Sequence, residues 1–331
     1  MELHRPAYFD TFRCIASACP DSCCQEWDVQ VDPDKAELYR SLPGPLGQRL
    51  REVLVEEDGE TIMTIIDRRC PMWRQDGLCR IQAELGEEAL CHTCREFPRL
   101  THDYGNFVEK GLELSCPEAA RILLQYPNPE IITTQQDGGD EPEYDTEAME
   151  VLLRTRETAR AILADPGYTT NEALAQFLLY GYQAQGELDG DESAPFHADA
   201  ALEDARQFAA PADVTAMLDF FAQLEILTLT WPQRLKSPAP TQWSDLHRAL
   251  GRYFLDRYWL QAVSDYDLVS RVKLTVISCL MVRILGGDPV QTAQQYSKEI
   301  ENSIENLEAV LDGAYRAGAF TDVQLLGLLL L

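Results

Sequence analysis

Apolar residues recur at three- and four-residue steps through most of the C-terminal two-thirds of the chain. This is the spacing of helices that bury one face. Polar stretches at 186–193 and 237–240 interrupt the pattern, so we predict breaks between helices there. We therefore expect an all-α domain over residues 145–331, with helices at 147–164, 171–185, 212–229, 245–263, 266–284, 289–311 and 323–331.

The first 126 residues show shorter and less regular patterns. Asp32-Pro33 combines a favoured helix-capping residue with proline at the first helical position, and predicts a short helix directly afterwards. Helical spacing follows at 45–57, a β-rich run at 61–66 and helix formers at 87–97. A polar stretch at 135–144 belongs to a linker or exposed loop that we place at 127–144. The prediction is a mainly α protein, with an irregular region at 1–126 packed on the helical domain.

Charge and hydropathy narrow the possible partners. The formal net charge is −27, which argues against a nucleic-acid partner because phosphate contact requires clustered Lys and Arg. We find no apolar run near the roughly 20 residues needed to span a bilayer. The N-terminus shows no basic segment followed by an apolar one, so we expect no secretory signal and a cytoplasmic location.

Cysteines are concentrated in the first 116 residues. In a reducing compartment, clustered cysteines are more often metal ligands or catalytic groups than disulfides. A single cysteine is often a small buried apolar residue, and this is our interpretation of Cys279, which lies outside the cluster. Several of the clustered cysteines instead adjoin Pro, Gly or charged residues. The nine clustered residues are Cys14, Cys19, Cys23, Cys24, Cys70, Cys79, Cys91, Cys94 and Cys116.

Thiolate ligands suit both zinc and iron–sulfur clusters, and each site needs about four protein ligands. Eight or nine cysteines could therefore form one site with spare residues, or two sites. We predict a cysteine-rich metal-binding region over residues 1–126, with iron–sulfur favoured over zinc.

Four cysteine motifs follow one another between Phe12 and Arg121: FRC-x4-C-x3-CC-x2-W, C-P-x-W-x3-G-L-C-R-I-Q, T-C-R-x-F-P-R and L-S-C-P-E-A-A-R. Their ordered succession resembles the flagellin lysine N-methylase family. The shorter core of the same motifs resembles a wider group of small zinc- or iron-chelating proteins. Beyond residue 126 the likeness is only that of a helical region of suitable length.

The resemblance implies transfer of a methyl group from S-adenosylmethionine to lysine side chains of flagellin, with a [4Fe–4S] cluster required. It also implies that Cys91 is a spectator. Among the family's cysteines we favour Cys19, Cys23, Cys79 and Cys94 as the four ligands, followed closely by Cys24 and Cys70. The family's cysteines fall on Cys14, Cys19, Cys23, Cys24, Cys70, Cys79, Cys94 and Cys116.

Methyl transfer to lysine requires an unprotonated amine, whereas free lysine has a pKa near 10.4. A base or a desolvated pocket is therefore expected, although each candidate could equally be an ordinary surface residue. The candidate bases are Glu26, Asp76, Glu96 and Tyr104. Arginines that could offset the charge of a thiolate-bound centre are Arg95, Arg99 and Arg121. Rings that could shield it from water, or stack on adenine, are Trp27, Trp73 and Phe97.

Two alternatives to the enzyme remain open. A structural zinc ion or iron–sulfur cluster could fold the N-terminal region of a non-catalytic interaction module. The same cluster could instead serve a redox protein. Binding of the methyl donor separates the enzyme from both alternatives.

Overall fold

The N-terminal strand of the protein lies inside a four-stranded sheet. The computed structural model describes residues 1–25 and 29–331. Strand β1 (Glu2–Pro6) lies between β6 (Phe107–Leu112), with which it pairs in parallel, and β7 (Ile131–Gln135), with which it pairs antiparallel. Strand β5 (Arg99–Asp103) completes the sheet beside β6. The sheet thus joins the beginning of the chain to segments far along it.

A three-stranded sheet with order β2-β4-β3 belongs to a separate small lobe, defined here as residues 29–96. Its core contains the buried side chains of Val29, Tyr39, Leu50 and Met72. The elements of the small lobe are β2 (Val29–Val31), α1 (Pro33–Ser41), α2 (Gly44–Val53), β3 (Leu54–Glu57), β4 (Glu60–Met63), α3 (Arg80–Leu85) and α4 (His92–Glu96).

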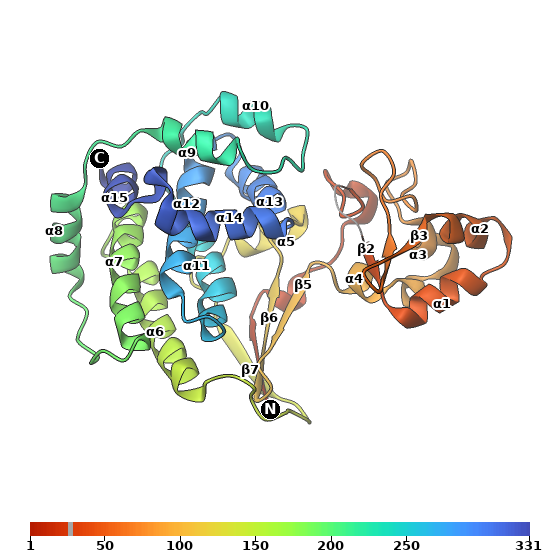
Figure 1. The fold of residues 1–331 in the computed structure, drawn as a ribbon, viewed down its shortest axis with the longest axis horizontal. Coiled ribbons are helices and arrows are strands. Elements are labelled where there is room, and N and C mark those ends of the chain that lie inside the picture. The colour runs from red at the N-terminus through yellow and green to blue at the C-terminus, as the bar shows by residue number, and fades with distance from the viewer. Residues whose placement is uncertain (26–28) are drawn as a thin grey trace.

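The large lobe, defined as residues 1–12 and 99–331, surrounds helix α12 (Leu268–Leu285), whose side chains are nearly all buried. Figure 1 shows the two lobes side by side, with β5 and β6 between them. The other helices of the large lobe are α5 (Pro117–Leu123), α6 (Thr146–Ala164), α7 (Thr170–Leu188), α8 (Ala198–Phe208), α9 (Val214–Phe221), α10 (Trp231–Lys236), α11 (Asp245–Tyr258), α13 (Pro289–Ile300), α14 (Ile304–Arg316) and α15 (Asp322–Leu330).

The two hydrophobic cores divide the N-terminal part of the chain between them. Phe9, Phe12, Phe107 and Leu114 pack in the large core together with the C-terminal helices, whereas residues 29–91 build the small one. The division into a metal-binding region at 1–126, a linker or loop at 127–144 and a helical domain at 145–331 stays a prediction. Within 127–144, which we took for a linker or loop, residues 131–135 form the edge strand β7.

The mainly α class is confirmed, since helices hold 56% of the structure. Small sheets accompany them in the N-terminal part, which is therefore more regular than expected. The helices predicted at 147–164, 171–185 and 266–284 are present, as is the one after Asp32. No helix in the described part of the chain is long and apolar enough to cross a membrane.

Two predicted helices differ in length, one because of a tertiary contact and the other because of a local helix cap. The helix expected at 212–229 ends at Phe221, and the N–H groups of Leu227 and Thr228 donate to the buried carboxylate of Glu299 at 2.9 and 2.7 Å. The segment 289–311 forms two helices, α13 and α14, because the hydroxyl of Ser303 accepts from the N–H of Asn306 and starts a new one.

A buried ion pair joins the sheet to the first long helix of the large lobe. Arg156 of α6 donates through both terminal nitrogens to the carboxylate of Glu109 on β6, at 2.8 and 2.6 Å. The Arg156 side chain is only 4% exposed. Removing one partner of such a pair leaves an uncompensated charge in a poorly solvated place.

We expect Glu109→Ala to lower the free energy of unfolding by about 3 kcal/mol, because Arg156 would remain buried without its carboxylate. The measurement is denaturant unfolding of the large lobe followed by circular dichroism. Asp312→Ala, which removes an exposed pair with Arg316, is the matched control and should change stability by less than about 0.5 kcal/mol. Equal effects of the two variants would contradict the role of the buried pair.

A buried histidine makes the large lobe sensitive to acid. His247 is 1% exposed, and its Nδ1 accepts from the N–H of Ser244 at the start of α11. Burial and the nearby Arg283 lower the pKa of His247 to about 4. In the unfolded chain the pKa returns to about 6.5.

We expect the free energy of unfolding to decrease as the pH is lowered from about 6.5 to 4. In this range His247 of the unfolded chain binds a proton, whereas His247 of the folded chain does not. The pH dependence of the thermal midpoint measures this. His247→Gln removes the titrating group and should flatten the curve in that window, at some cost in stability at pH 7. A curve of unchanged slope would show that other groups carry the acid sensitivity.

Candidate metal centre

Of the nine clustered cysteines, all but Cys116 lie on the segments that connect the two lobes or in the small lobe. Cys14 and Cys19 flank a short 3₁₀ turn at Ala16–Ala18, just after Phe12 leaves the large core. The N–H of Cys70 donates to the carbonyl oxygen of Cys24 at 2.7 Å. This backbone bond brings the first cysteine group beside the second.

The thiols of three cysteines form a chain of contacts. The Cys23 thiol donates a hydrogen bond to Cys24, and the Cys24 thiol donates one to Cys70. Cys79 is close enough to interact electrostatically with Cys24 and Cys70, and a backbone bridge pairs it with Trp73. Residues far apart in sequence therefore converge around Cys24 and Cys70.

A second thiol pair lies on the same side of the small lobe. Cys91 precedes helix α4, and its thiol accepts a hydrogen bond from Cys94 one turn later. Cys94 also interacts electrostatically with Cys24 and Cys70. Cys91 is thus in contact with a candidate ligand, but its position as a spectator stays a prediction.

The third cysteine segment comes from the large lobe. Cys116 precedes helix α5 and is buried in the large core, where it interacts electrostatically with Cys19 and Cys23. The carboxylate of Asp21 holds this arrangement in place. It accepts from Lys298 of α13 at 3.1 Å and from Gln294 at 3.0 Å, while Gln294 also donates to the carbonyl oxygen of Ser115 at 2.7 Å.

Burial and mutual contact set the protonation of these thiols. The hydrogen bond with Cys24 and burial raise the pKa of Cys23, whereas the bond that Cys24 donates lowers the pKa of Cys70. In the same way the bond from Cys94 lowers the pKa of Cys91. The thiols of Cys70 and Cys91 therefore favour the thiolate form, which is the form that binds metal, whereas Cys23, Cys24 and Cys94 have raised pKa values.

The donor set suits a thiolate-bound metal, because soft sulfur ligands are present in more than the number that one site requires. Across residues 1–25 and 29–331, three or more cysteine, histidine or carboxylate side chains are nowhere grouped as the ligands of an ion. The thiols lie near one another without surrounding a common point. The choice of Cys19, Cys23, Cys79 and Cys94 as ligands stays a prediction.

The structure places the other candidate residues as follows. Glu26 and Trp27 lie outside the described residues. Asp76 and Glu96 form ion pairs with Arg74 and Arg95 at 2.6 and 3.4 Å.

Tyr104 packs on the ring of Phe107 at 4.8 Å between centroids. Burial and the negative charge of Glu109 raise the pKa of Tyr104, so its phenol stays protonated at neutral pH. Cys279 is completely buried among apolar side chains, as expected.

Arginine side chains cover aromatic rings near the cysteines. Arg69 lies over the ring of Trp73 at 4.1 Å, and Arg99 lies over Phe12 at 5.3 Å. Arg121 instead pairs with Glu118 and is exposed. Two rings next to the cysteines are thus covered by cationic side chains.

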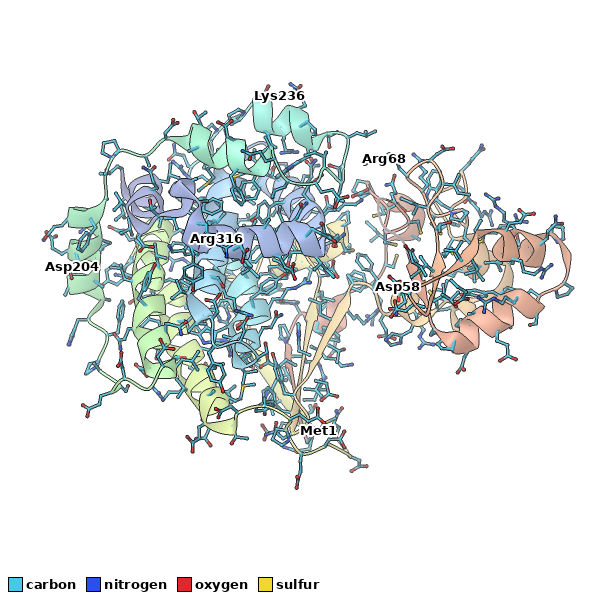
Figure 2. The ribbon with its side chains drawn as sticks, viewed as in Figure 1. Met1, Asp58, Arg68, Asp204, Lys236 and Arg316 are labelled. Carbon is cyan, nitrogen blue, oxygen red and sulfur yellow. The ribbon has the colours of Figure 1, made fainter. Side chains whose placement is uncertain are left out.

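The contacts between the lobes were not visible in the sequence. Arg68 of the small lobe donates a hydrogen bond to the carbonyl oxygen of Leu227 across the junction (Figure 2). Asp21 and Lys298 are 277 positions apart, and no local pattern links them. Only the proximity of Asp21 to the first cysteine motif could have drawn attention to it.

Comparison with known proteins relates most of the chain to one group of proteins. The chain is 26% identical over 314 residues to the lysine-N-methylase of Salmonella typhimurium, covering 90% of this chain and 71% of that protein. A lysine-N-methylase of Salmonella choleraesuis matches to the same extent. The flagellar biosynthetic protein FliU of Salmonella muenchen is 34% identical over 130 residues, or 77% of its length. The chain belongs to the flagellin lysine N-methylase family.

Membership of this family confirms the resemblance seen in the cysteine motifs. The 314-residue match extends the relationship from the motifs to most of the helical region. No family model matches the chain, and no solved structure matches it.

We expect Cys70→Ser to remove most of the iron or zinc bound by anaerobically purified protein, because the Cys70 thiol accepts from Cys24 and lies near Cys79 and Cys94. Cys279→Ser should leave the metal content unchanged, since Cys279 is buried in the large core. Elemental analysis with assay of acid-labile sulfide measures both. Full metal content in Cys70→Ser would exclude this group of thiols as the binding site.

Proposed function

We propose that the protein transfers a methyl group from S-adenosylmethionine to lysine side chains of a flagellin-type substrate. The relationship to proteins named lysine-N-methylase over 90% of this chain carries the proposal. The relative named FliU, a flagellar biosynthetic protein, supports a flagellar substrate.

The reaction breaks the bond between the methyl carbon and the sulfonium of the donor and forms a carbon–nitrogen bond on lysine. The donor leaves as a neutral thioether, and the lysine nitrogen must give up a proton. Asp76 and Glu96 are paired with arginines, and the raised pKa of Tyr104 keeps it protonated. We therefore favour desolvation of the bound lysine, which lowers the pKa of its amine, over proton transfer to one of these three side chains.

We propose further that a [4Fe–4S] cluster is held by Cys23, Cys24 and Cys70, whose thiols contact one another, together with Cys79 or Cys94. In this proposal Cys24 and Cys70 take the place of Cys19 in the set favoured from the sequence. When bound, such a cluster supplies a redox-active centre whose potential is set by burial and hydrogen bonds. The protein's own groups fix its surroundings. Lys298 anchors the first cysteine segment through Asp21, and its charge partly offsets that of nearby thiolates.

The charge of the protein suits a substrate that presents lysine. Acidic residues outnumber Lys and Arg by 55 to 28, so long-range attraction favours a partner with exposed cationic side chains. This attraction affects the rate at which the substrate meets the enzyme. Deprotonation of the substrate lysine depends instead on the surroundings of its amine in the site.

We expect reconstituted protein to transfer labelled methyl groups from S-adenosylmethionine to purified flagellin, detected by mass spectrometry of its lysines. The protein is purified and assayed without oxygen. Cys70→Ser should reduce methylation by at least about tenfold, whereas Cys279→Ser should retain it. If the loaded protein neither binds the donor nor methylates flagellin, the enzyme proposal fails and a structural zinc or redox role becomes the better account.

A further inference from the structure

Strand β5 forms an edge of the four-stranded sheet, because it pairs with β6 on one side only. In an antiparallel pair, every second residue of a strand points its N–H and carbonyl groups away from the partner strand. Two backbone bonds fix the alternation in β5. At one end the N–H of Tyr104 donates to the carbonyl oxygen of Phe107, and at the other the N–H of Glu113 donates to that of Pro98. The residues of β5 whose backbone groups point outward are therefore Arg99, Thr101 and Asp103.

The outward backbone groups of β5 are open. They make no hydrogen bond with any residue that the structure describes, and the side chains of Thr101 and Asp103 are exposed. Proteins usually blunt such an edge with lysine, proline, a bulge or a covering segment. The strand contains neither lysine nor proline, and its pairing with β6 runs without a bulge. The edge of β5 therefore has the geometry to accept another strand.

The edges of the three-stranded sheet in the small lobe are protected. Strand β3 ends in two glutamates, of which Glu56 forms an ion pair with Arg40. Strand β2 has only three residues, and the hydroxyl of Thr93 in α4 donates to its carbonyl oxygen at Gln30. Charge, short length and covering are the usual means of blunting an edge. The open edges are thus those of the four-stranded sheet, β5 at one side and β7 at the other.

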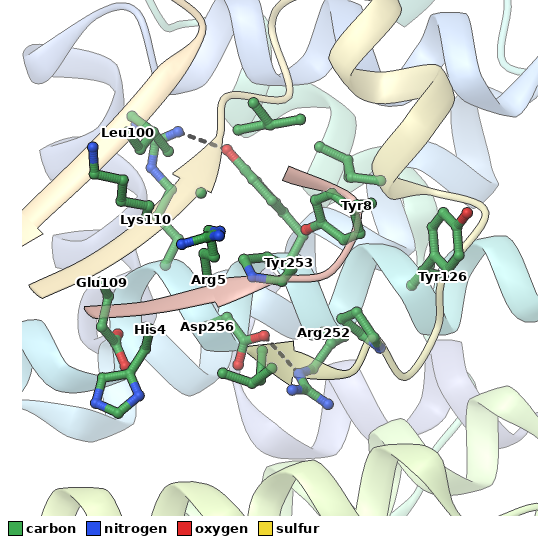
Figure 3. A pocket seen from close by; sticks show the side chains of 18 of the residues that line it. His4, Arg5, Tyr8, Leu100, Glu109, Lys110, Tyr126, Arg252, Tyr253 and Asp256 are labelled. Carbon is green, nitrogen blue, oxygen red and sulfur yellow. Dashed lines mark hydrogen bonds and ion pairs between the residues drawn. The ribbon is translucent and has the colours of Figure 1, made fainter. Parts of the chain in front are cut away.

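Of these two edges, β5 is the one beside the cysteine group. It begins five residues after Cys94, and its partner β6 ends four residues before Cys116. Figure 1 shows β5 on the side of the sheet nearest the small lobe. Its residue Leu100 lines a pocket between the sheet and α11 (Figure 3), so one face of β5 packs against the large lobe while its outer edge stays open. A strand added to β5 would have one end at the cysteines.

We infer that the edge of β5 binds an extended segment of the flagellin-type substrate as an additional strand, which brings a lysine of that segment to the cysteine group. The choice of this occupant rests on the proposed function. Pairing along a sheet edge recognises an extended polypeptide through its main chain. The carboxylate of Asp103 has no cationic partner among the residues that the structure describes, and opposite charges across a ladder stabilise the pairing. The edge therefore suits a segment that carries positive charge.

Hydrogen–deuterium exchange of the full-length, metal-loaded protein tests the inference, with purified flagellin as the probe. At saturating flagellin the amides of Arg99, Thr101 and Asp103 should exchange at least about tenfold more slowly, because each N–H then donates to the added strand. The amide of Thr133 in the opposite edge strand β7 should exchange at an unchanged rate. Unchanged exchange along β5 would overturn the inference, and so would the absence of flagellin binding.

A matched pair of proline variants tests the same edge by calorimetric titration with flagellin. Thr101→Pro removes an outward N–H that β6 does not use, and should weaken binding by at least about tenfold. Thr133→Pro is the control, because Thr133 is an exposed residue in the middle of β7. Its N–H also points outward, since the bond from the N–H of Ala7 to the carbonyl oxygen of Glu130 sets the alternation there. This control should bind flagellin as the unaltered protein does.

Circular dichroism shows whether both variants are folded, and the exchange experiment on the unaltered protein does not depend on them. Equal affinity of folded Thr101→Pro and the unaltered protein for flagellin would overturn the inference. Methylation of the same flagellin separates this inference from the proposed function. Methyl transfer without protection of β5 overturns the inference and keeps the function, whereas protection of β5 without methyl transfer supports the inference and counts against the function.

Discussion

The chain crosses twice between two hydrophobic cores, and the arrangement of the cysteines depends on these crossings. The first runs from Phe12 in the large core to Val29 in the small one. The second leaves the small core after Cys91 and reaches Phe97, which packs against the large core. Both crossings carry cysteines, so two connections that the topology requires also bring thiols from distant parts of the sequence together.

A buried ion pair stabilises the junction between the two lobes, where these crossings lie. Acidic residues dominate the protein as a whole, yet Lys298 is almost fully buried beside Asp21, where it fixes the first cysteine segment to α13. A buried ion pair repays its desolvation only with good geometry and additional hydrogen bonds. Here Gln294 supplies such bonds to Asp21 and Ser115, and the same contacts tie the cysteine segment to the start of α5.

The thiols themselves explain why a metal suits this place. Several lie partly buried in contact with one another, and not all of them can ionise together without strong repulsion. A bound metal replaces the protons and offsets the charge of the thiolates, so its binding would add to the stability of the junction. The family relationship gives this chemistry a context in protein lysine methylation.

The sequence by itself determined the long helices, the helix after Asp32, the burial of Cys279 and the family. These follow from local spacing, capping residues and ordered motifs, all of which act between near neighbours in the chain. Only the tertiary structure decided that β1 lies between β6 and β7, that Glu299 accepts from the backbone N–H groups of Leu227 and Thr228, and which side chains line the pocket between the sheet and α11. Strands of five or six residues carry little periodicity, and a pocket wall built from several elements forms only when distant segments pack together.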